Sequence, residues 1–251
     1  MFPIIPANSA AESGNDEGIF GFGSINPVTA KTNLVSNTGV ISTDITGVGT
    51  ARYSAMGCEY GGDKGIYAFG YADPNYVSMS NLVSDAGVIA SDTATVGTAM
   101  GTQGCEYGND TGIMAFGITT GNALVSTSNL ISNVGVVASD TAGVGTGRTG
   151  PGACSFGGDK GIFGFGNDGS YVSMTNLVSN AGVVATDTAG VGTDRSSVGG
   201  CEYGGDKGIF AFGYDGSNIG ESNLVSNAGV VASDTAAVGS ATYFPGACSF
   251  N

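Results

Sequence analysis

The chain has 251 residues, of which 46 are glycine, 7 are basic and 21 are acidic, so its formal net charge is −14. The scarcity of Lys and Arg argues against nucleic acid and anionic membranes as partners, and an apolar fraction of 41% argues against a disordered chain. The chain has no His, which excludes Ser-His-Asp and Cys-His catalysis and His-based metal sites.

Residues 1–15 read MFPIIPANSAAESGN and precede the regular part of the sequence. They contain no basic region and no long apolar run, so we expect no signal peptide. No stretch of the chain approaches the apolar length of a membrane-spanning helix, and we expect no membrane insertion. Residues 1–15 are predicted to form an N-terminal arm on the outside of a single domain at 16–251.

Three phrases recur five times in the predicted domain. The first begins at Asp16, Asp63, Asp110, Asp159 and Asp206, at steps of 47, 47, 49 and 47 residues. The second, NLVSNAGVVASDTAGVGT or a close variant, begins at Asn33, Asn81, Asn129, Asn176 and Asn223. The third, GCEYGG or ACSFGG, carries one cysteine per copy. Repetition at this period indicates a fold built from five similar units.

Each unit is predicted to contain four short antiparallel strands. In the second copy these strands are 55–60 (AMGCEY), 65–70 (GIYAFG), 78–84 (SMSNLVS) and 88–96 (VIASDTATV), with a turn at 61–64 (GGDK). The aromatic residues of GIYAFG are two apart and are predicted to lie on one face. Turn residues every 8–12 positions without a helical period are typical of a β-meander.

A period in the forties with four strands per unit favours an all-β, five-bladed β-propeller over a β-helix, whose coils need far fewer residues. A four-stranded sheet of this size has two apolar faces, and a ring of sheets buries both. We predict that residues 242–250 pair with 18–23, which closes the ring and removes exposed sheet edges. On this interpretation AAESGN (10–15) is a displaced remnant of the first strand.

The phrase GGDKGIFGFG (157–166) could be mistaken for a phosphate-binding loop. A phosphate loop needs glycines that lead into the N-terminus of a helix, so that backbone N–H groups converge on the anion. Here the glycines lead into a predicted strand. They are better explained by a hairpin turn that requires positive φ, and we expect no bound cofactor.

Two residue types recur once per copy and allow more than one interpretation. A small core residue is the simpler role for the cysteines, although a ring of thiols that binds a soft metal or forms disulfides is an alternative. A turn-capping role is preferred for the aspartates, although acidic rings can also bind calcium or serve in acid–base chemistry. The residues are Cys58, Cys105, Cys154, Cys201 and Cys248, and Asp44, Asp92, Asp140, Asp187 and Asp234.

Differences between copies concentrate in the loop after each GFG and in the segment that begins each first strand. Both regions are expected on one face of the ring, opposite GGDK, where variable loops on a rigid scaffold suit ligand binding. Drift in unconstrained loops is the alternative explanation. The candidate ligand-binding residues are Arg52, Tyr53, Tyr71, Tyr76, Arg148, Asn167, Asp168, Tyr171, Arg195, Tyr214, Asp215 and Tyr243. No catalytic or metal-binding residue is predicted.

The order of these phrases resembles the kelch-type repeat over 16–251. An Arg precedes a small-residue strand (ARYSAMGCEY), an apolar strand ends in glycine (GIYAFG), and a DT-rich segment leads to the next Arg (DTAGVGTDR). The kelch double glycine is reduced to a single Gly, and Val replaces the signature Trp. The resemblance implies that the cysteine-bearing strand is innermost in each blade, and that the C-terminal segment supplies the innermost strand of the first blade.

The wording of the repeats also resembles tandem repeats of bacteriophage tail and other virion-associated proteins. That resemblance implies a non-enzymatic structural or recognition protein, made in the cytoplasm and located on a virion or outside the cell after assembly. The expected partners are other virion or surface proteins, with host glycans as a further candidate. A carbohydrate-binding, lectin-like propeller is the alternative function. An enzyme with two catalytic carboxylates would need an asymmetric acid pair, which nearly equivalent copies do not favour.

Overall fold

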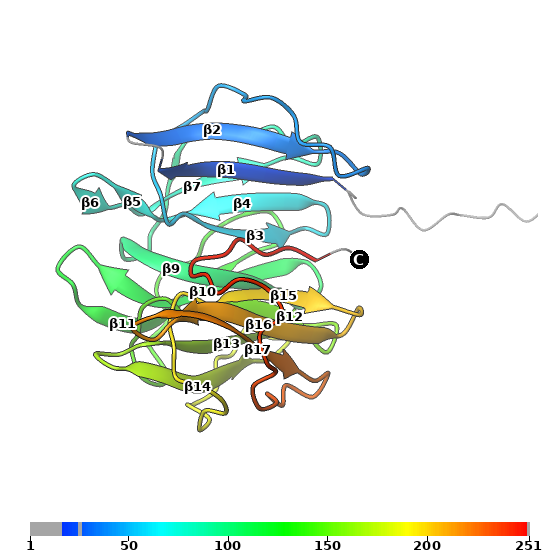
Figure 1. Cartoon of the computed structure of the whole chain (residues 1–251). Coiled ribbons are helices and arrows are strands. Elements are labelled where there is room, and N and C mark those ends of the chain that lie inside the picture. The colour runs from blue at the N-terminus through cyan, green and yellow to red at the C-terminus, as the bar shows by residue number, and fades with distance from the viewer. Residues whose placement is uncertain (1–16, 25–26, 250–251) are drawn as a thin grey trace, which may run out of the picture.

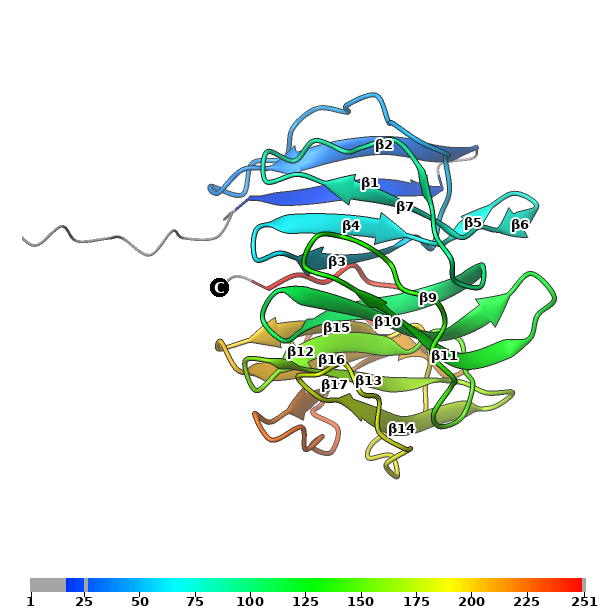
Figure 2. The same ribbon diagram turned by 180° about the vertical axis from the view of Figure 1, so that it is seen from behind.

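The computed structural model describes residues 17–24 and 27–249, and every regular element in them is a β-strand. All strand pairs are antiparallel, so the predicted all-β class and meander connectivity are confirmed. In this part of the chain, five sheets follow one another in chain order, and a sixth, two-stranded sheet extends from the second (Figures 1 and 2). The described residues contain no helix long and apolar enough to cross a membrane.

The first two sheets come from residues 18–94. Sheet 1 has two strands, β1 (Gly18–Ser24) and β2 (Val28–Val35). Sheet 2 has four: β3 (Met56–Tyr60), β4 (Lys64–Ala68), β7 (Met79–Val83) and the short β8 (Thr93–Ala94). A separate hairpin of β5 (Tyr71–Ala72) and β6 (Asn75–Tyr76) extends from sheet 2.

The last three sheets have three strands each. Sheet 3 contains β9 (Met100–Tyr107), β10 (Thr111–Thr119) and β11 (Leu124–Ile131). Sheet 4 contains β12 (Gly152–Phe156), β13 (Lys160–Asn167) and β14 (Tyr171–Val178). Sheet 5 contains β15 (Gly199–Tyr203), β16 (Lys207–Tyr214) and β17 (Asn218–Val225).

The GGDK phrase forms the turn between the first two strands of a sheet, as predicted. Gly61 and Gly62 have φ values of 64° and 77°, a left-handed conformation that glycine adopts without steric cost. We call the end of the sheets that carries the turns 61–63, 108–110, 157–159 and 204–206 the turn end. The opposite end carries the β5–β6 hairpin, the connections 120–123, 168–170 and 215–217, and the segments 51–55, 147–151, 194–198 and 241–245; we call it the loop end (Figure 1).

The prediction that the aromatic residues of GIYAFG share one face is wrong. In sheet 4, Phe163 packs edge-to-face on Phe116 of sheet 3, whereas Phe165 packs on Phe210 of sheet 5. The cause is a bulge: Phe165 has φ 64°, and the register with β14 shifts between Gly164 and Gly166. A bulge changes which face the following side chain occupies. The second strand of sheet 4 therefore presents one ring to sheet 3 and one to sheet 5.

The predicted fourth strand is present only as isolated contacts in most copies. In sheet 2, Val83 and Ile89 form one bridge, and β8 is two residues long. Between them, the carbonyl of Ala90 accepts a hydrogen bond from the Asn81 side chain at 3.0 Å. The same side chain donates to Oδ1 of Asp92 at 2.9 Å, so side-chain bonds join the third strand to this segment.

Adjacent sheets bury apolar side chains between them. Met56 and Phe69 of sheet 2 share a buried cluster with Met100 and Met114 of sheet 3, and equivalent clusters join sheets 3 and 4 and sheets 4 and 5. The first strands lie next to one another, with β9 between β3 and β12, and β12 beside β15. The strands that carry the first four cysteines therefore lie side by side.

The first and last parts of the repeat array are not joined by a strand ladder among the described residues. Within the described residues, sheet 1 has only β1 and β2, and 242–249 forms no ladder with β1. Phe20 of β1 is 54% exposed and Leu224 of β17 is 41% exposed, so the outer faces of sheets 1 and 5 are partly uncovered. The predicted arm at 1–15, with its remnant strand, lies outside the described residues.

Candidate functional site

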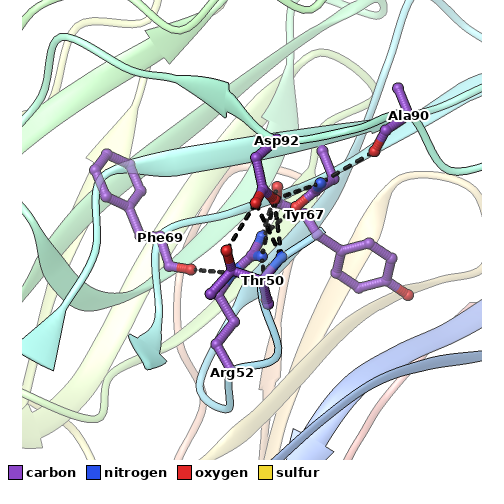
Figure 3. A network of polar contacts seen from close by, with 7 residues as sticks. Thr50, Arg52, Tyr67, Phe69, Ala90 and Asp92 are labelled. Atoms are coloured by element: carbon purple, nitrogen blue, oxygen red, sulfur yellow. Dashed lines mark hydrogen bonds and ion pairs between the residues drawn. The ribbon is translucent and has the colours of Figure 1, made fainter. Parts of the chain in front are cut away.

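Arg52 lies between sheets 1 and 2 and is fully buried (Figure 3). Its Nε donates to the carbonyl of Phe69 at 2.6 Å, and its Nη1 donates to the carbonyl of Thr50 at 3.1 Å. Its Nη2 donates to Oδ1 of Asn81 at 2.7 Å. The guanidinium also lies 4.1 Å from the ring centroid of Phe22 in sheet 1, within cation–π range. One side chain therefore joins the two sheets.

Asp92 completes this arrangement. One carboxylate oxygen accepts from Nδ2 of Asn81 at 2.9 Å, and the other accepts from Oγ1 of Thr50 at 2.7 Å and from its backbone N–H at 2.9 Å. Nη1 of Arg52 lies 3.9 Å away. Burial alone would raise the pKa of Asp92, but the hydrogen bonds and the charge of Arg52 outweigh it and lower the pKa. The aspartate therefore remains ionised and bonds to the segment that enters the sheet.

The same arrangement recurs twice, and we call each instance an arginine network. Arg148 and Arg195 are also fully buried, and burial lowers the pKa of Arg148 to about 10. Their networks comprise Thr146, Phe165, Asn176 and Asp187, and Thr193, Phe212, Asn223 and Asp234. The prediction that Arg52, Arg148 and Arg195 contact a ligand on the surface is therefore wrong, because all three guanidinium groups are buried and hydrogen-bonded within the protein.

The junction between sheets 2 and 3 lacks an arginine. Met100 occupies the equivalent position and is fully buried. Thr98 and Asn129 still bond to Asp140, but Oδ1 of Asn129 is buried and has no partner among the described residues. In this copy the segment before the cysteine is one residue shorter, and β9 runs from Met100 without the positive-φ residue that Ser54 and Ser197 provide elsewhere.

The loop end carries a first tyrosine cluster made of Tyr53, Tyr71 and Tyr76. The ring centroids of Tyr53 and Tyr71 are 5.2 Å apart, and those of Tyr71 and Tyr76 are 5.1 Å apart. Tyr53 is 38% exposed and the other two are half-buried. Burial raises the pKa of Tyr71 and Tyr76, so these phenols are neutral at physiological pH.

A second aromatic cluster runs from sheet to sheet. The ring centroids of Tyr171 in sheet 4 and Tyr214 in sheet 5 are 6.0 Å apart, and those of Tyr214 and Tyr243 are 5.6 Å apart. The ring centroids of Tyr243 and Phe244 are 5.4 Å apart, and Tyr243 is 51% exposed and Phe244 65% exposed. The six predicted tyrosines thus form two groups, and both groups lie at the loop end.

The other predicted polar residues shape the connections beside these clusters. Oδ1 of Asn167 accepts from the N–H of Gly169, and Oδ1 of Asp168 accepts from the N–H of Ser170 at 3.1 Å. Oδ1 of Asp215 accepts from both the N–H and the hydroxyl of Ser217 at 3.0 Å. These bonds fix the turns and leave further carboxylate oxygens of Asp168 and Asp215 for contacts with other molecules.

Three glutamates on the first strands were not predicted as site residues. Glu59, Glu106 and Glu202 each follow a cysteine, and burial and the charge of Glu59 raise the pKa of Glu202. Burial is the largest cause for Glu106, whose pKa rises to about 7 with further contributions from Glu59, Glu202 and Asp110. The signal available in the sequence is the position after each cysteine, which is Glu in three copies and Ser in two.

The five cysteines are free thiols. The Sγ atoms of Cys58, Cys105 and Cys154 face the next sheet, where a Cβ atom added to Gly112, Gly161 or Gly208 would lie 2.6–2.7 Å away. Burial raises the pKa of Cys105 to about 12, so its thiol is protonated at physiological pH. Among residues 17–24 and 27–249, no group of three or more His, Cys, Asp or Glu side chains could hold a metal ion. The predicted core role is confirmed for Cys105 and Cys154, which are buried, whereas Cys58 and Cys201 are half-buried and Cys248 is exposed.

Comparison with known proteins gives only a likeness of fold. No protein-family model matches the sequence, and no curated protein matches it. Among solved structures, the "Structure of YjhT" is similar, with a TM-score of 0.69 at 11% sequence identity. The similarity covers 93% of this chain and 84% of that chain. At this identity the likeness describes the arrangement of strands and carries no activity or ligand to this protein.

Proposed function

We propose that this chain is a non-enzymatic recognition module that binds a partner through its loop end. The observation that carries the proposal is the gathering of tyrosines there. Six tyrosines lie in the loops after GFG or before a first strand. Their rings form two separate clusters, and within each cluster neighbouring rings are in contact. The turn end instead repeats nearly the same phrase in every copy.

Buried links between the sheets favour a rigid scaffold beneath this surface. Arginine networks link sheets 1 and 2, 3 and 4, and 4 and 5 through buried side chains. Buried hydrogen bonds to a charged group restrict movement between the elements that they join. Side chains at the loop end are then presented in fixed relative positions, which lowers the entropy cost of binding.

We further propose that the five sheets are the blades of a β-propeller, and that 242–250 completes the first blade against β1. Two backbone bonds support this placement. The N–H of Phe244 donates to the carbonyl of Ser197 at 3.0 Å, as the N–H of Ser197 donates to that of Gly150 at 2.7 Å. The C-terminal segment therefore begins beside sheet 5 in the way that β15 begins beside sheet 4.

A cysteine at position 19 tests this closure. In sheets 2, 4 and 5 the cysteine of the first strand lies opposite an isoleucine of the second, as in Cys58 and Ile66. By the same register Cys248 would lie opposite Ile19, at a separation that suits a disulfide. Ile19→Cys should form a Cys248 disulfide within the monomer, detected by peptide mapping under mild oxidation. A variant that remains fully reduced, or that links only between molecules, contradicts closure.

The proposal that this protein associates with virions rests on the sequence resemblance of its repeats to those of phage virion proteins, and particle binding tests it. The double variant Tyr53→Ser/Tyr71→Ser changes the loop end, and Lys160→Ser/Lys207→Ser changes exposed side chains of the turn end as a matched control. Co-sedimentation of the tagged protein with phage particles from producing cells should fall for the first variant only. Equal losses for both variants, or no association of the unchanged protein, would contradict the proposal.

Carbohydrate binding is the second candidate function, and the second aromatic cluster favours it. Tyr171 and Tyr214 lie beside turns that contain Asn167, Asp168 and Asp215, and aromatic rings with amide or carboxylate groups suit sugar hydroxyls and C–H faces. A glycan array is the measurement. Binding that Tyr214→Ser abolishes supports this function, and an empty array alongside retained particle association removes it.

A further inference from the structure

The first tyrosine cluster is built by backbone pairing. Tyr53 bridges Tyr71, with hydrogen bonds of 3.1 and 2.8 Å between their backbones, and Tyr71 lies opposite Tyr76 in the β5–β6 hairpin. Residues that are directly opposite in antiparallel pairs project to the same side. The three rings therefore form a continuous row across three extended segments.

Only the second copy has tyrosine at all three positions of this row. The same pairing exists in sheets 4 and 5, where an extended segment, the end of the second strand and the start of the third lie opposite one another. The equivalent residues there are Thr149, Asn167 and Tyr171, and Ser196, Tyr214 and Asn218. The scaffold is thus repeated, whereas the three-ring row is specific to one copy.

The charge around the row has one sign. Asp73 is exposed in the turn of the β5–β6 hairpin, and its carboxylate adds to burial in raising the pKa of Tyr71. None of the seven basic side chains is available to neutralise it. Three are the buried arginines, and each of the four lysines pairs with an aspartate, namely Lys31 with Asp44, Lys64 with Asp63, Lys160 with Asp159 and Lys207 with Asp206.

We propose that Tyr53, Tyr71 and Tyr76, with Asp73, bind an alkylammonium group of the partner. This inference rests on the proposed function of the loop end and names the chemistry that the surface recognises. Aromatic faces attract cations through their quadrupole, and a nearby carboxylate adds a full negative charge. A net charge of −14 repels anionic ligands and steers cationic ones toward the surface. A surface that displays choline or methylated amines is the kind of partner that fits.

Titration with small probes tests the proposal without knowledge of the partner. Choline is compared with 3,3-dimethyl-1-butanol, its uncharged isostere, by NMR of the intact protein. Choline should bind with a Kd on the order of millimolar, about tenfold more tightly than the isostere, and should weaken as salt increases. Tyr71→Leu should weaken choline binding about tenfold, whereas Tyr71→Phe keeps the ring and should retain it.

Matched variants in the fifth copy separate this site from general effects. Tyr214→Leu and Asp215→Asn occupy comparable positions beside an incomplete row and should leave choline binding unchanged, while Asp73→Asn should weaken it. Circular dichroism of each variant confirms folding. The proposal is overturned if the isostere binds as tightly as choline, if Tyr214→Leu is as damaging as Tyr71→Leu, or if folded protein binds no choline. In that last case, continued particle binding that Tyr53→Ser/Tyr71→Ser abolishes would show that only the ligand class is wrong.

Discussion

Arg148→Met is the most informative single test of what holds the sheets together. The substitution removes the donors to the carbonyl of Phe165 at 2.7 Å, to Oδ1 of Asn176 at 2.7 Å and to the carbonyl of Thr146 at 3.2 Å. It also removes a guanidinium that lies 3.8 Å from the ring centroid of Phe116. A methionine fills much of the volume, so the main effect is the loss of polar partners.

The expected cost can be worked from these contacts. The acceptors on Phe165 and Asn176 are in buried hydrogen bonds, and an orphaned buried acceptor costs about 1–3 kcal/mol. Thr146 and Asp187 are accessible enough to bond with water instead. Relief of the guanidinium's desolvation offsets part of the loss, as the lowered pKa of Arg148 indicates. The net destabilisation should be about 3 kcal/mol.

The assay is urea unfolding followed by circular dichroism, because the chain has no Trp. With a slope of about 2 kcal/mol/M, the midpoint should fall by about 1.5 M. Lys160→Met is the matched control, since Lys160 pairs with Asp159 on the surface of the same sheet and should change stability by less than about 0.5 kcal/mol. If Arg148→Met unfolds within about 0.5 kcal/mol of this control, the arginine networks do not hold the sheets together.

Three further predictions address other contacts. Because the pKa of Glu106 is raised to about 7 by burial and neighbouring acids, the folded state holds its proton more tightly than the unfolded chain, and stability falls as pH rises from about 4.5 to about 7. Glu106→Gln should therefore raise the free energy of unfolding by about 1 kcal/mol near pH 8 and leave it unchanged near pH 5; the same gain at both pH values would show that titration is not the cause. Gly112→Ala would place a Cβ atom 2.7 Å from Sγ of Cys58 and should cost about 1–3 kcal/mol, whereas Gly121→Ala, with open space around it, should be nearly neutral; equal melting temperatures would contradict the packing. Tyr67→Phe removes a hydroxyl that donates to a carbonyl of β1 at 2.9 Å and should lower stability by about 1 kcal/mol in the same unfolding assay, with an unchanged midpoint as the contrary result.

The repeat made much of the fold predictable. The hairpin between the first two strands follows from glycines at a turn and from alternating side chains, and both are local features of the sequence. The bulge at Phe165 was not predictable in this way, because a phenylalanine with φ 64° contradicts its local preference. It is stabilised by the carbonyl that it presents to Nε of Arg148, a residue 17 positions away in the chain.

The arginines show why the site was only partly predictable. A single Arg among glycine, serine and threonine has the sequence appearance of a surface residue, and charged side chains are rarely buried without partners. Its acceptors come from three separate parts of the chain, so local composition gives no sign of them. A weak signal existed in the spacing, because Arg52, Arg148 and Arg195 all lie six residues before a cysteine.

The structure also gives a physical reason for the unequal variation of the two ends. At the turn end, the N–H of Gly61 donates to the carbonyl of Asp110 in the next turn, and Oδ2 of Asp110 accepts from Nδ2 of Asn133 at 3.0 Å. A Cβ atom on Gly61 would lie 2.9 Å from the carbonyl of Asn133, so specific residues are required there.

The loop end is held by bonds that almost any residue can make. The N–H of the glycine after the positive-φ phenylalanine of each GFG or AFG phrase donates to a backbone carbonyl of the following segment, as Gly70 does to Met100 and Gly117 to Arg148. Side chains beyond these bonds can change without disturbing the neighbouring sheet. A repeat of this kind can therefore carry three tyrosines in its second copy and none at the same positions in its third, and differences of that kind are what a binding surface requires.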